Sequence, residues 1–210
     1  MSTPTATAET QQEFLSSFAE LEALLCATPS WPSVRAALGI QPPADEQVVL
    51  AGLASLIVRG LAKVSPDNVP EIKESVAVLV HRVGAATSLV NVTYAGAHGL
   101  IKPFLLCDAG GTGGRVMISA IGAGILRLQA LVDDRGLPGQ AGVLTASLLD
   151  AEDGTVHVSY PGRPSVAIRK AGGQWELAAP ENAPFRPVSR QEALNAASLL
   201  SNEPAAQKED

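Results

Sequence analysis

The sequence predicts an α+β fold in which N-terminal helices pack on an antiparallel sheet and one short helix closes the chain. Apolar residues recur at helical spacing between Glu13 and Lys63. From Leu89 onward, β-branched segments alternate with Gly, Asp and Pro, which is typical of strands joined by turns. Ser189 is followed three residues later by Glu192, a capping box that predicts the closing helix. Helices followed by a run of strands indicate the α+β class.

Length and composition predict the organisation of the chain. It has 210 residues, of which 46% are hydrophobic and 17% charged, so it can bury a sizeable core. Residues 1–10 and 202–210 have the composition of disordered tails. Between the tails we expect a helical region at 11–84 and an antiparallel β region with the closing helix at 85–201. The two regions are expected to form one domain, because an antiparallel sheet must bury its apolar face against something.

The helical region is expected to hold four helices. Apolar residues with helical spacing are Phe14, Phe18, Leu21, Leu24, Leu25, Leu50, Leu53, Leu56, Ile57 and Leu61. Prolines at positions 29, 32, 42 and 43 divide this part into about three helices. A fourth helix is predicted after Asn68 as N-cap, with Pro70 and Glu71 in its first turn and an end near Gly84.

The β region is expected to hold two antiparallel groups of strands. The predicted strands are 88–95, 100–107, 114–121 and 124–132, then 142–149, 154–160, 164–170 and 173–178. A connector with turn composition, Asp133–Gln140, separates the groups. Asp153-Gly154 and Gly172-Gly173 are predicted hairpin turns in the second group.

Net charge argues against polyanionic partners. The chain has 15 Lys and Arg against 21 Asp and Glu, a formal charge of -6. We therefore expect neither nucleic acid nor an anionic membrane as a partner. The segment Val49–Lys63 could be read as the recognition helix of a winged helix. That interpretation needs a basic face, whereas residues 45–84 carry four basic and five acidic side chains.

Several features predict a cytoplasmic protein. Met1–Gln12 has no basic segment followed by an apolar core, so it is not read as a secretory signal. The longest stretch without charged residues, Val83–Ile101, is interrupted by polar residues and glycines, so no transmembrane span is expected. Cys26 and Cys107 are the two cysteines, a usage typical of a reducing compartment.

No complete catalytic signature is present in the sequence. His81, His98 and His157 are too dispersed for metal-ligand spacing, and neither cysteine lies in a CxxC motif. The Gly-x-Ser-x-Gly turn of a serine hydrolase does not occur. We therefore predict no catalytic residues, no bound metal and no cofactor.

One glycine-rich string leaves an alternative open. Residues 105–118, Leu-Leu-Cys-Asp-Ala-Gly-Gly-Thr-Gly-Gly-Arg-Val-Met-Ile, resemble the first phosphate-binding hairpin of glucokinase-like sugar kinases. Glycines let backbone N–H groups approach a phosphate, and an aspartate can hold water or Mg²⁺. Under this alternative the chain binds a nucleotide or sugar phosphate through Asp108, Gly110, Gly111, Thr112 and Arg115. The simpler interpretation is a glycine-rich turn between two strands.

The order of the elements resembles the EspG family of cytosolic chaperones for type VII secretion in actinobacteria. The features that carry the resemblance are the helix Leu53–Leu61, the apolar helix Val76–Val83, the strands Phe104–Asp108, Arg115–Ile118 and Gly124–Leu128, and the later strands Ser165–Arg169 and around Trp175, with a terminal helix after them. The Ala-, Gly-, Val- and Arg-rich composition is compatible with an actinobacterial source. EspG proteins are built from two related α/β halves and are generally longer than this chain.

The resemblance implies a function in protein binding. It implies a non-enzymatic chaperone or adaptor that holds an aggregation-prone helical substrate by its exposed hydrophobic tip. The expected partner is thus another protein, and the sequence sets no oligomeric state and no binding face.

Overall fold

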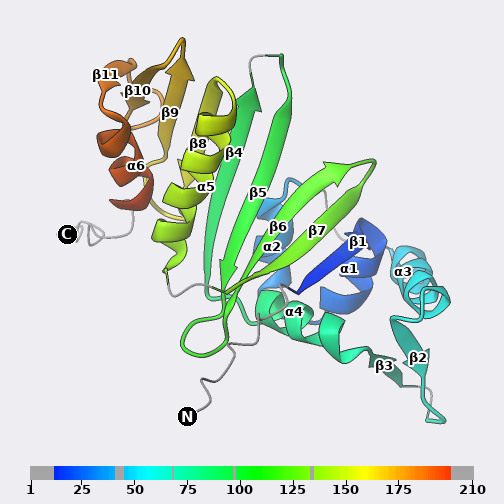
Figure 1. Ribbon diagram of the computed structural model, residues 1–210. Helices are drawn as coiled ribbons and strands as arrows, with labels where there is room; N and C mark the ends of the chain where they lie inside the picture. Colours follow the sequence, from blue (N-terminus) through cyan, green and yellow to red (C-terminus); the bar gives the residue numbers. More distant parts are fainter. Residues whose placement is uncertain (1–11, 41–44, 68, 97, 133–134, 200–210) are drawn as a thin grey trace, which may run out of the picture.

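The computed structural model describes residues 12–40, 45–67, 69–96, 98–132 and 135–199. Its helices are α1 (Phe18–Leu25), α2 (Trp31–Ala37), α3 (Glu46–Val58), α4 (Glu74–Gly84), α5 (Leu137–Ala151) and α6 (Arg190–Leu199). Its strands are β1 (Glu13–Ser17), β2 (Ala62–Val64), β3 (Pro70–Ile72), β4 (Ser88–Gly96), β5 (Ile101–Asp108), β6 (Arg115–Gly122), β7 (Ile125–Leu131), β8 (Gly154–Ser159), β9 (Val166–Ala171), β10 (Gln174–Ala178) and β11 (Arg186–Val188). This arrangement confirms the predicted α+β class (Figure 1).

The two predicted groups of strands join into one antiparallel sheet. Its nine strands lie in the order β1-β7-β6-β5-β4-β8-β9-β10-β11. Strands β4 and β8 pair at its middle, with Thr93 opposite His157. The short strands β2 and β3 form a separate hairpin. A helix followed by four antiparallel strands thus occurs twice in the described part of the chain, as α4 with β4–β7 and as α5 with β8–β11.

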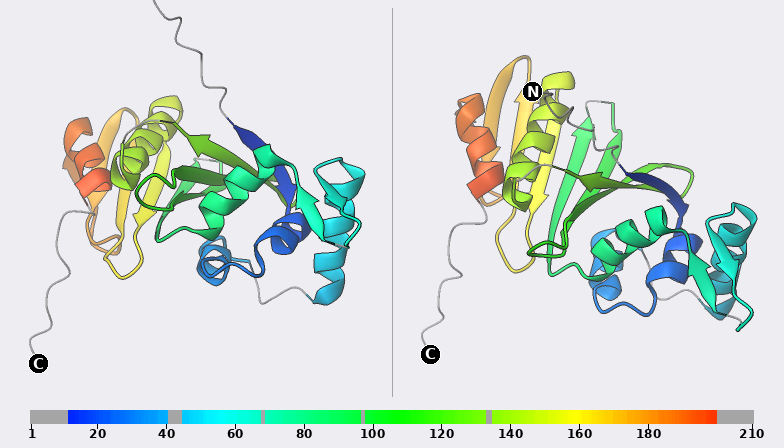
Figure 2. Two further views of the ribbon diagram at one scale, coloured as in Figure 1. Left: turned by 90° about the horizontal axis from the view of Figure 1, so that it is seen from below. Right: turned by 60° about the horizontal axis from the view of Figure 1, so that its bottom comes forward.

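Helices cover opposite faces of the two halves of the sheet (Figure 2). One core lies between α1–α4 and the strands β1 and β5–β7, and it contains Leu105 and Cys107 of β5. The other core lies between α5, α6 and the strands β4 and β8–β10, and it contains Leu106. Successive side chains of a strand point to opposite faces, so β5 contributes to both cores. Each half of the sheet consequently has one face that no described helix covers.

Two close contacts fix α1 against α3 in the first half. Ser17 and Glu20 form a capping box at the start of α1. The buried Glu20 carboxylate also accepts hydrogen bonds from Ser55 Oγ at 2.7 Å and from Arg59 Nη1 at 2.8 and 2.7 Å. Gly52 of α3 lies against the backbone of Ala19, where a Cβ would overlap the carbonyl oxygen. The helices therefore approach more closely than any side chain at position 52 allows.

The largest error of the sequence analysis is the predicted strand 142–149. These residues belong to α5, which begins after Gly136 and has Pro138 in its first turn. The predicted turn at Asp133–Gln140 is wrong at its end, because its last residues start this helix; residues 133–134 lie outside the described residues. The predicted hairpin at Asp153-Gly154 is also wrong, because these residues join α5 to β8.

The helical region also contains strands that were not predicted. Residues 13–17 form the edge strand β1, in which Phe14 lies opposite Leu128 of β7. Residues 70–72, expected in the first turn of the fourth helix, form β3, and the helix begins at Glu74. The proposed N-cap Asn68 and the tails 1–10 and 202–210 lie outside the described residues.

The remaining strand predictions, one hairpin turn and the helix start at Ser189 are confirmed. Seven of the predicted strands correspond to β4–β10. Gly172 and Gly173 join β9 to β10 with φ of +57° and +81°, a conformation that favours glycine. Ser189 Oγ accepts a hydrogen bond from Glu192 N at 3.1 Å at the start of α6.

Candidate functional site

The glycine-rich string forms the tight connection between β5 and β6, as both interpretations of it expected. Ala109 N donates to the Gly114 carbonyl at 3.2 Å, and Gly113 N donates to the Gly110 carbonyl at 2.9 Å. Gly110, Gly111 and Gly114 have φ of +74°, +50° and +80°. Glycine adopts this region without the steric cost that a Cβ brings, so the composition follows from the turn geometry.

The Asp108 carboxylate is engaged within the hairpin itself. One carboxylate oxygen accepts a hydrogen bond from Gly110 N at 2.8 Å, and the other accepts one from Arg115 Nε at 2.9 Å. The structure thus brings together three of the five residues of the phosphate-binding alternative. Gly111 and Thr112 lie on the exposed part of the turn. Phosphate binding by the hairpin stays a prediction, and an anion there would have to compete with Asp108 for Arg115.

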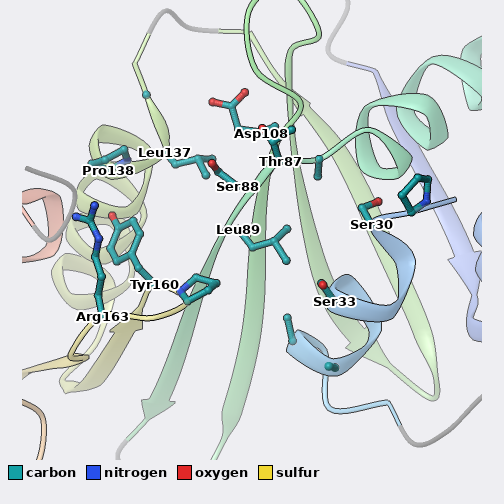
Figure 3. Close-up of a pocket in the computed structure, with 16 residues that line it drawn as sticks. Ser30, Ser33, Thr87, Ser88, Leu89, Asp108, Leu137, Pro138, Tyr160 and Arg163 are labelled. Atoms are coloured by element: carbon teal, nitrogen blue, oxygen red, sulfur yellow. The ribbon is translucent and has the colours of Figure 1, made fainter. Parts of the chain in front are cut away.

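A wide groove lies next to this hairpin, at the end of the sheet where β4 begins (Figure 3). Its volume is about 1020 Å³. Helix α2 forms one wall, and the β8–β9 connection with the start of α5 forms the other. Leu89 lies between Ser33 on the first side and Tyr160 on the second. The lining residues are Pro29, Ser30, Ser33, Ala36, Ala37, Ala86, Thr87, Ser88, Leu89, Asp108, Gly136, Leu137, Pro138, Tyr160, Pro161 and Arg163.

Two hydroxyl groups that line the groove are hydrogen-bonded within the chain. The lining residues of the groove are mostly small or apolar. Ser30 Oγ donates to the Val83 carbonyl at 2.7 Å, and Tyr160 Oη donates to the Ala197 carbonyl at 3.4 Å. Burial raises the pKa of Tyr160 to about 12, so its hydroxyl stays protonated near neutral pH. Across the described residues, no group of three His, Cys, Asp or Glu side chains is placed to hold a metal ion.

The volume of the groove lies at the upper end of the range for small-molecule sites. Sites for small molecules are enclosed clefts of about 300–1,000 Å³ that bury most of the ligand. This groove reaches the upper end of that range and is open along the molecular surface.

No local sequence pattern marks this groove. Its walls come from segments about twenty to over one hundred residues apart, and none of them carries a recognised motif. One usable signal was Pro138, because proline in a first turn is typical of a helix start and would have placed the beginning of α5 correctly.

Comparisons with known proteins identify the fold. No protein-family model matches the sequence, and a search of curated proteins gives no significant match. The structure is similar to a solved structure of the Mycobacterium tuberculosis type VII secretion system chaperone EspG5 in complex with a PE25-PPE41 dimer. The TM-score is 0.58 at 11% sequence identity, and the match covers 91% of this chain and 97% of that chain.

None of the described helices has both the length and the apolar character required to cross a membrane.

At 11% identity the likeness to EspG5 concerns the fold, and it agrees with the order of elements that carried the resemblance in the sequence. The chain has the fold of the EspG type VII secretion chaperones.

Proposed function

We propose that this chain is a non-catalytic cytosolic protein-binding module that acts as a chaperone or adaptor for a helical secretion substrate. The observation that carries the proposal is the shared fold, which extends over 91% of this chain and 97% of the EspG5 chain. Fold alone does not assign a function, so the surface chemistry of this chain must agree with it.

The groove at the start of β4 supports this proposal. It offers small and apolar side chains over a large open surface, with Asp108 and Arg163 as its charged members. Such a surface fits the apolar end of a helical element, which would leave backbone groups and a few polar side chains at its rim. A substrate held there would have its exposed apolar tip shielded from other molecules.

The partner is proposed to be a protein with a role comparable to that of the PE25-PPE41 dimer in the EspG5 complex. Co-expression with protein pairs of this type, and with the products of genes adjacent to its own, should yield a complex that survives gel filtration. Leu89→Asp should weaken that complex by at least tenfold, because it places a charge on the floor of the groove. Failure of every such pair to bind the wild-type chain would contradict the proposal.

The nucleotide-binding alternative rests on the hairpin string and is tested separately. Mg-ATP titrated by calorimetry into the wild-type chain should give heat if the hairpin binds phosphate. Asp108→Ala would then abolish that heat, while its Tm should fall by only about 2–4 °C. No heat at millimolar Mg-ATP would remove this alternative and leave protein binding in place.

A further inference from the structure

Helix α3 is apolar on its outer face as well as on the face that packs against the rest of the chain. Its buried side holds Gly52 and Leu56. No charged residue occurs from Gln47 to Val58. A surface helix normally carries polar and charged side chains away from the core, and a helix that is apolar all round is normally covered. The outer face of α3 therefore has the composition of a buried surface.

The exposed apolar residues of α3 form one continuous stripe. Leu50 is 57% exposed, Ile57 38% and Val58 87%. Ala51 and Ala54 are exposed as well. With 3.6 residues per turn, these five positions lie side by side on one face of the helix, and we call them the α3 stripe. Single exposed apolar side chains are common on protein surfaces, whereas a contiguous set of them marks an interaction site.

The α3 stripe lies at the opposite end of the molecule from the closing helix. Figure 1 and both views of Figure 2 place α3 and the β2–β3 hairpin at one end and α6 at the other. The hairpin follows α3 in the chain and adds the exposed Val64 and Val69 to this end. The residues that line the groove do not include the stripe. A protein bound to the stripe would therefore leave the groove free.

The stripe is complementary to a second copy of itself. Ala54 lies at its middle, with Leu50 and Ile57 to one side and Ala51 and Val58 to the other, because residues seven apart lie almost in line along a helix. When two stripes meet antiparallel about a two-fold axis at Ala54, each Leu50 faces the second copy's Ile57. On the other side each Ala51 faces the second copy's Val58, so a small side chain meets a larger one. A two-fold dimer requires a self-complementary patch of this kind.

Charge favours the antiparallel orientation of the two helices. Asp45 and Glu46, both exposed, lie at the start of α3. Arg59 and Lys63 follow its end, with side chains 41% and 78% exposed. An antiparallel pair places each acidic start beside the basic end of the other copy, whereas a parallel pair would bring four carboxylates together. The two basic side chains also have acidic partners within the chain, so this contribution sets the orientation more than the affinity.

We propose that two copies of this chain associate through the α3 stripe as an antiparallel, two-fold symmetric pair of helices. The occupant is a second copy because the stripe matches itself in shape and carries no charge, although the whole chain has a formal charge of -6. Helix α3 has 13 residues, so it is about 20 Å long and 10–12 Å across, and its contact is smaller than the roughly 800 Å² per partner of a standard interface. We therefore expect a weak dimer that dissociates on dilution.

Sedimentation velocity of the chain alone, at concentrations from about 5 to 500 µM, tests the dimer. The wild-type mass should rise with concentration toward twice that of one chain. Leu50→Glu and Ala54→Glu should each raise the dissociation constant by about tenfold or more, because glutamate suits an exposed helix but opposes an apolar interface. Val143→Glu is the matched control: Val143 is 43% exposed on α5, away from α3, so the dissociation constant should not change. Thermal unfolding checks that each variant remains folded.

A mixing experiment tests the two-fold axis at Ala54. Ala54→Glu and Ala54→Lys should each be monomeric, because like charges would meet at the axis. An equimolar mixture of the two variants should form a dimer again, because the glutamate of one chain then faces the lysine of the other. A mixture that stays monomeric at concentrations where the wild-type chain is dimeric would overturn the proposed pairing of the helices.

The remaining outcomes separate this inference from the proposed function, of which it is independent. A wild-type chain that is monomeric at every concentration would overturn the dimer and leave the proposed function standing. A wild-type dimer that Leu50→Glu and Ala54→Glu do not weaken would also overturn the inference, because the two copies would then meet at another face. A monomeric wild-type chain whose complex with a protein pair is lost in Leu50→Glu would place that pair on α3 instead of a second copy. The absence of any complex with a protein pair would contradict the proposed function and leave the dimer standing.

Discussion

The two halves of the sheet differ in the face that their helices leave open. In the first half the open face carries Leu15, Phe104, Met117 and Leu131 among a few charged residues. In the second half the corresponding face carries Thr93, Thr155, His157, Arg169 and Glu176. The same arrangement of a helix and four strands thus gives one partly apolar surface and one polar surface.

The polar face of the second half satisfies its charges locally. Arg169 Nε donates to the Glu176 carboxylate at 2.6 Å, and the guanidinium stacks 4.3 Å from the ring centre of Phe185. His157 Nδ1 lies 3.8 Å from the Glu181 carboxylate. Residues after β10 thereby cover part of this face. The first half thus keeps Leu15 exposed beside half-buried apolar side chains, whereas the second half pairs its charges within the chain.

Adding a methyl group at a helix–helix contact should lower the free energy of unfolding more in the first half than in the second. Gly52→Ala should destabilise the chain by about 3 kcal/mol, because its Cβ would overlap the rigid backbone of Ala19. The matched variant is Gly142→Ala in the α5–α6 contact, where the added Cβ meets the movable Ser198 hydroxyl. We expect less than about 1 kcal/mol there, since alanine also favours the helix. Chemical denaturation measures both, and equal losses would contradict the difference between the two contacts.

Glu20 should make the stability of the first half depend on pH. Burial by itself raises the pKa of Glu20, but hydrogen bonds from Ser55, Ser17 N and Arg59 outweigh it and hold this pKa below its ordinary value of 4.5. A lowered pKa stabilises the folded state above the ordinary value, and this contribution is lost as pH falls through the folded pKa. Glu20→Gln should therefore cost about 2 kcal/mol at pH 7, the scale of hydrogen bonds to a charged group. The gap from wild type should narrow below pH 4.5 in denaturation curves, and a gap that widens there would refute the assignment.

In the hairpin next to the groove, backbone strain should lower the free energy of unfolding more than loss of the Asp108 carboxylate does. Gly111→Val should cost about 1–2 kcal/mol, because a β-branched residue is forced to positive φ. Asp108→Ala should cost about 1 kcal/mol through the lost hydrogen bonds to Gly110 N and Arg115. Thermal denaturation gives the order of the two effects. A Gly111→Val chain as stable as wild type would mean that this glycine does not need positive φ.

The two cysteines should react with thiol reagents at different rates in the folded chain. Cys26 is exposed, whereas Cys107 is buried in the first core and burial raises the pKa of its thiol to about 12. The thiolate is the reactive form, so a thiol reagent should modify one cysteine quickly in the native chain and the second only after unfolding. Rapid reaction of both thiols would show that the first core opens under native conditions.

Local patterns predicted the parts of the fold that local contacts determine. Turn glycines such as Gly172 and the cap at Ser189 act over a few residues, so the sequence was sufficient to find them. The strand β1 could not be found in this way, because Phe14 and Phe18 have helical spacing. It is fixed by pairing with β7, more than one hundred residues later.

The candidate site was predictable only in its hairpin. The segment 142–149 contains Val, Thr and several Leu residues, so its composition also suits a strand. Its helical state depends on tertiary packing of Ala141 and Leu149 against the second core. The start of α5 forms part of the groove wall. The groove could therefore not be predicted from a sequence in which this segment was expected to be a strand.

Hydrogen–deuterium exchange of the chain with and without its bound protein pair tests the central claim most directly. We predict slower exchange on binding in the groove walls at 29–37 and 160–163. Residues 173–186 on the polar side of the second half should exchange equally in both states. Protection confined to residues 173–186, with the groove walls unchanged, would contradict the account.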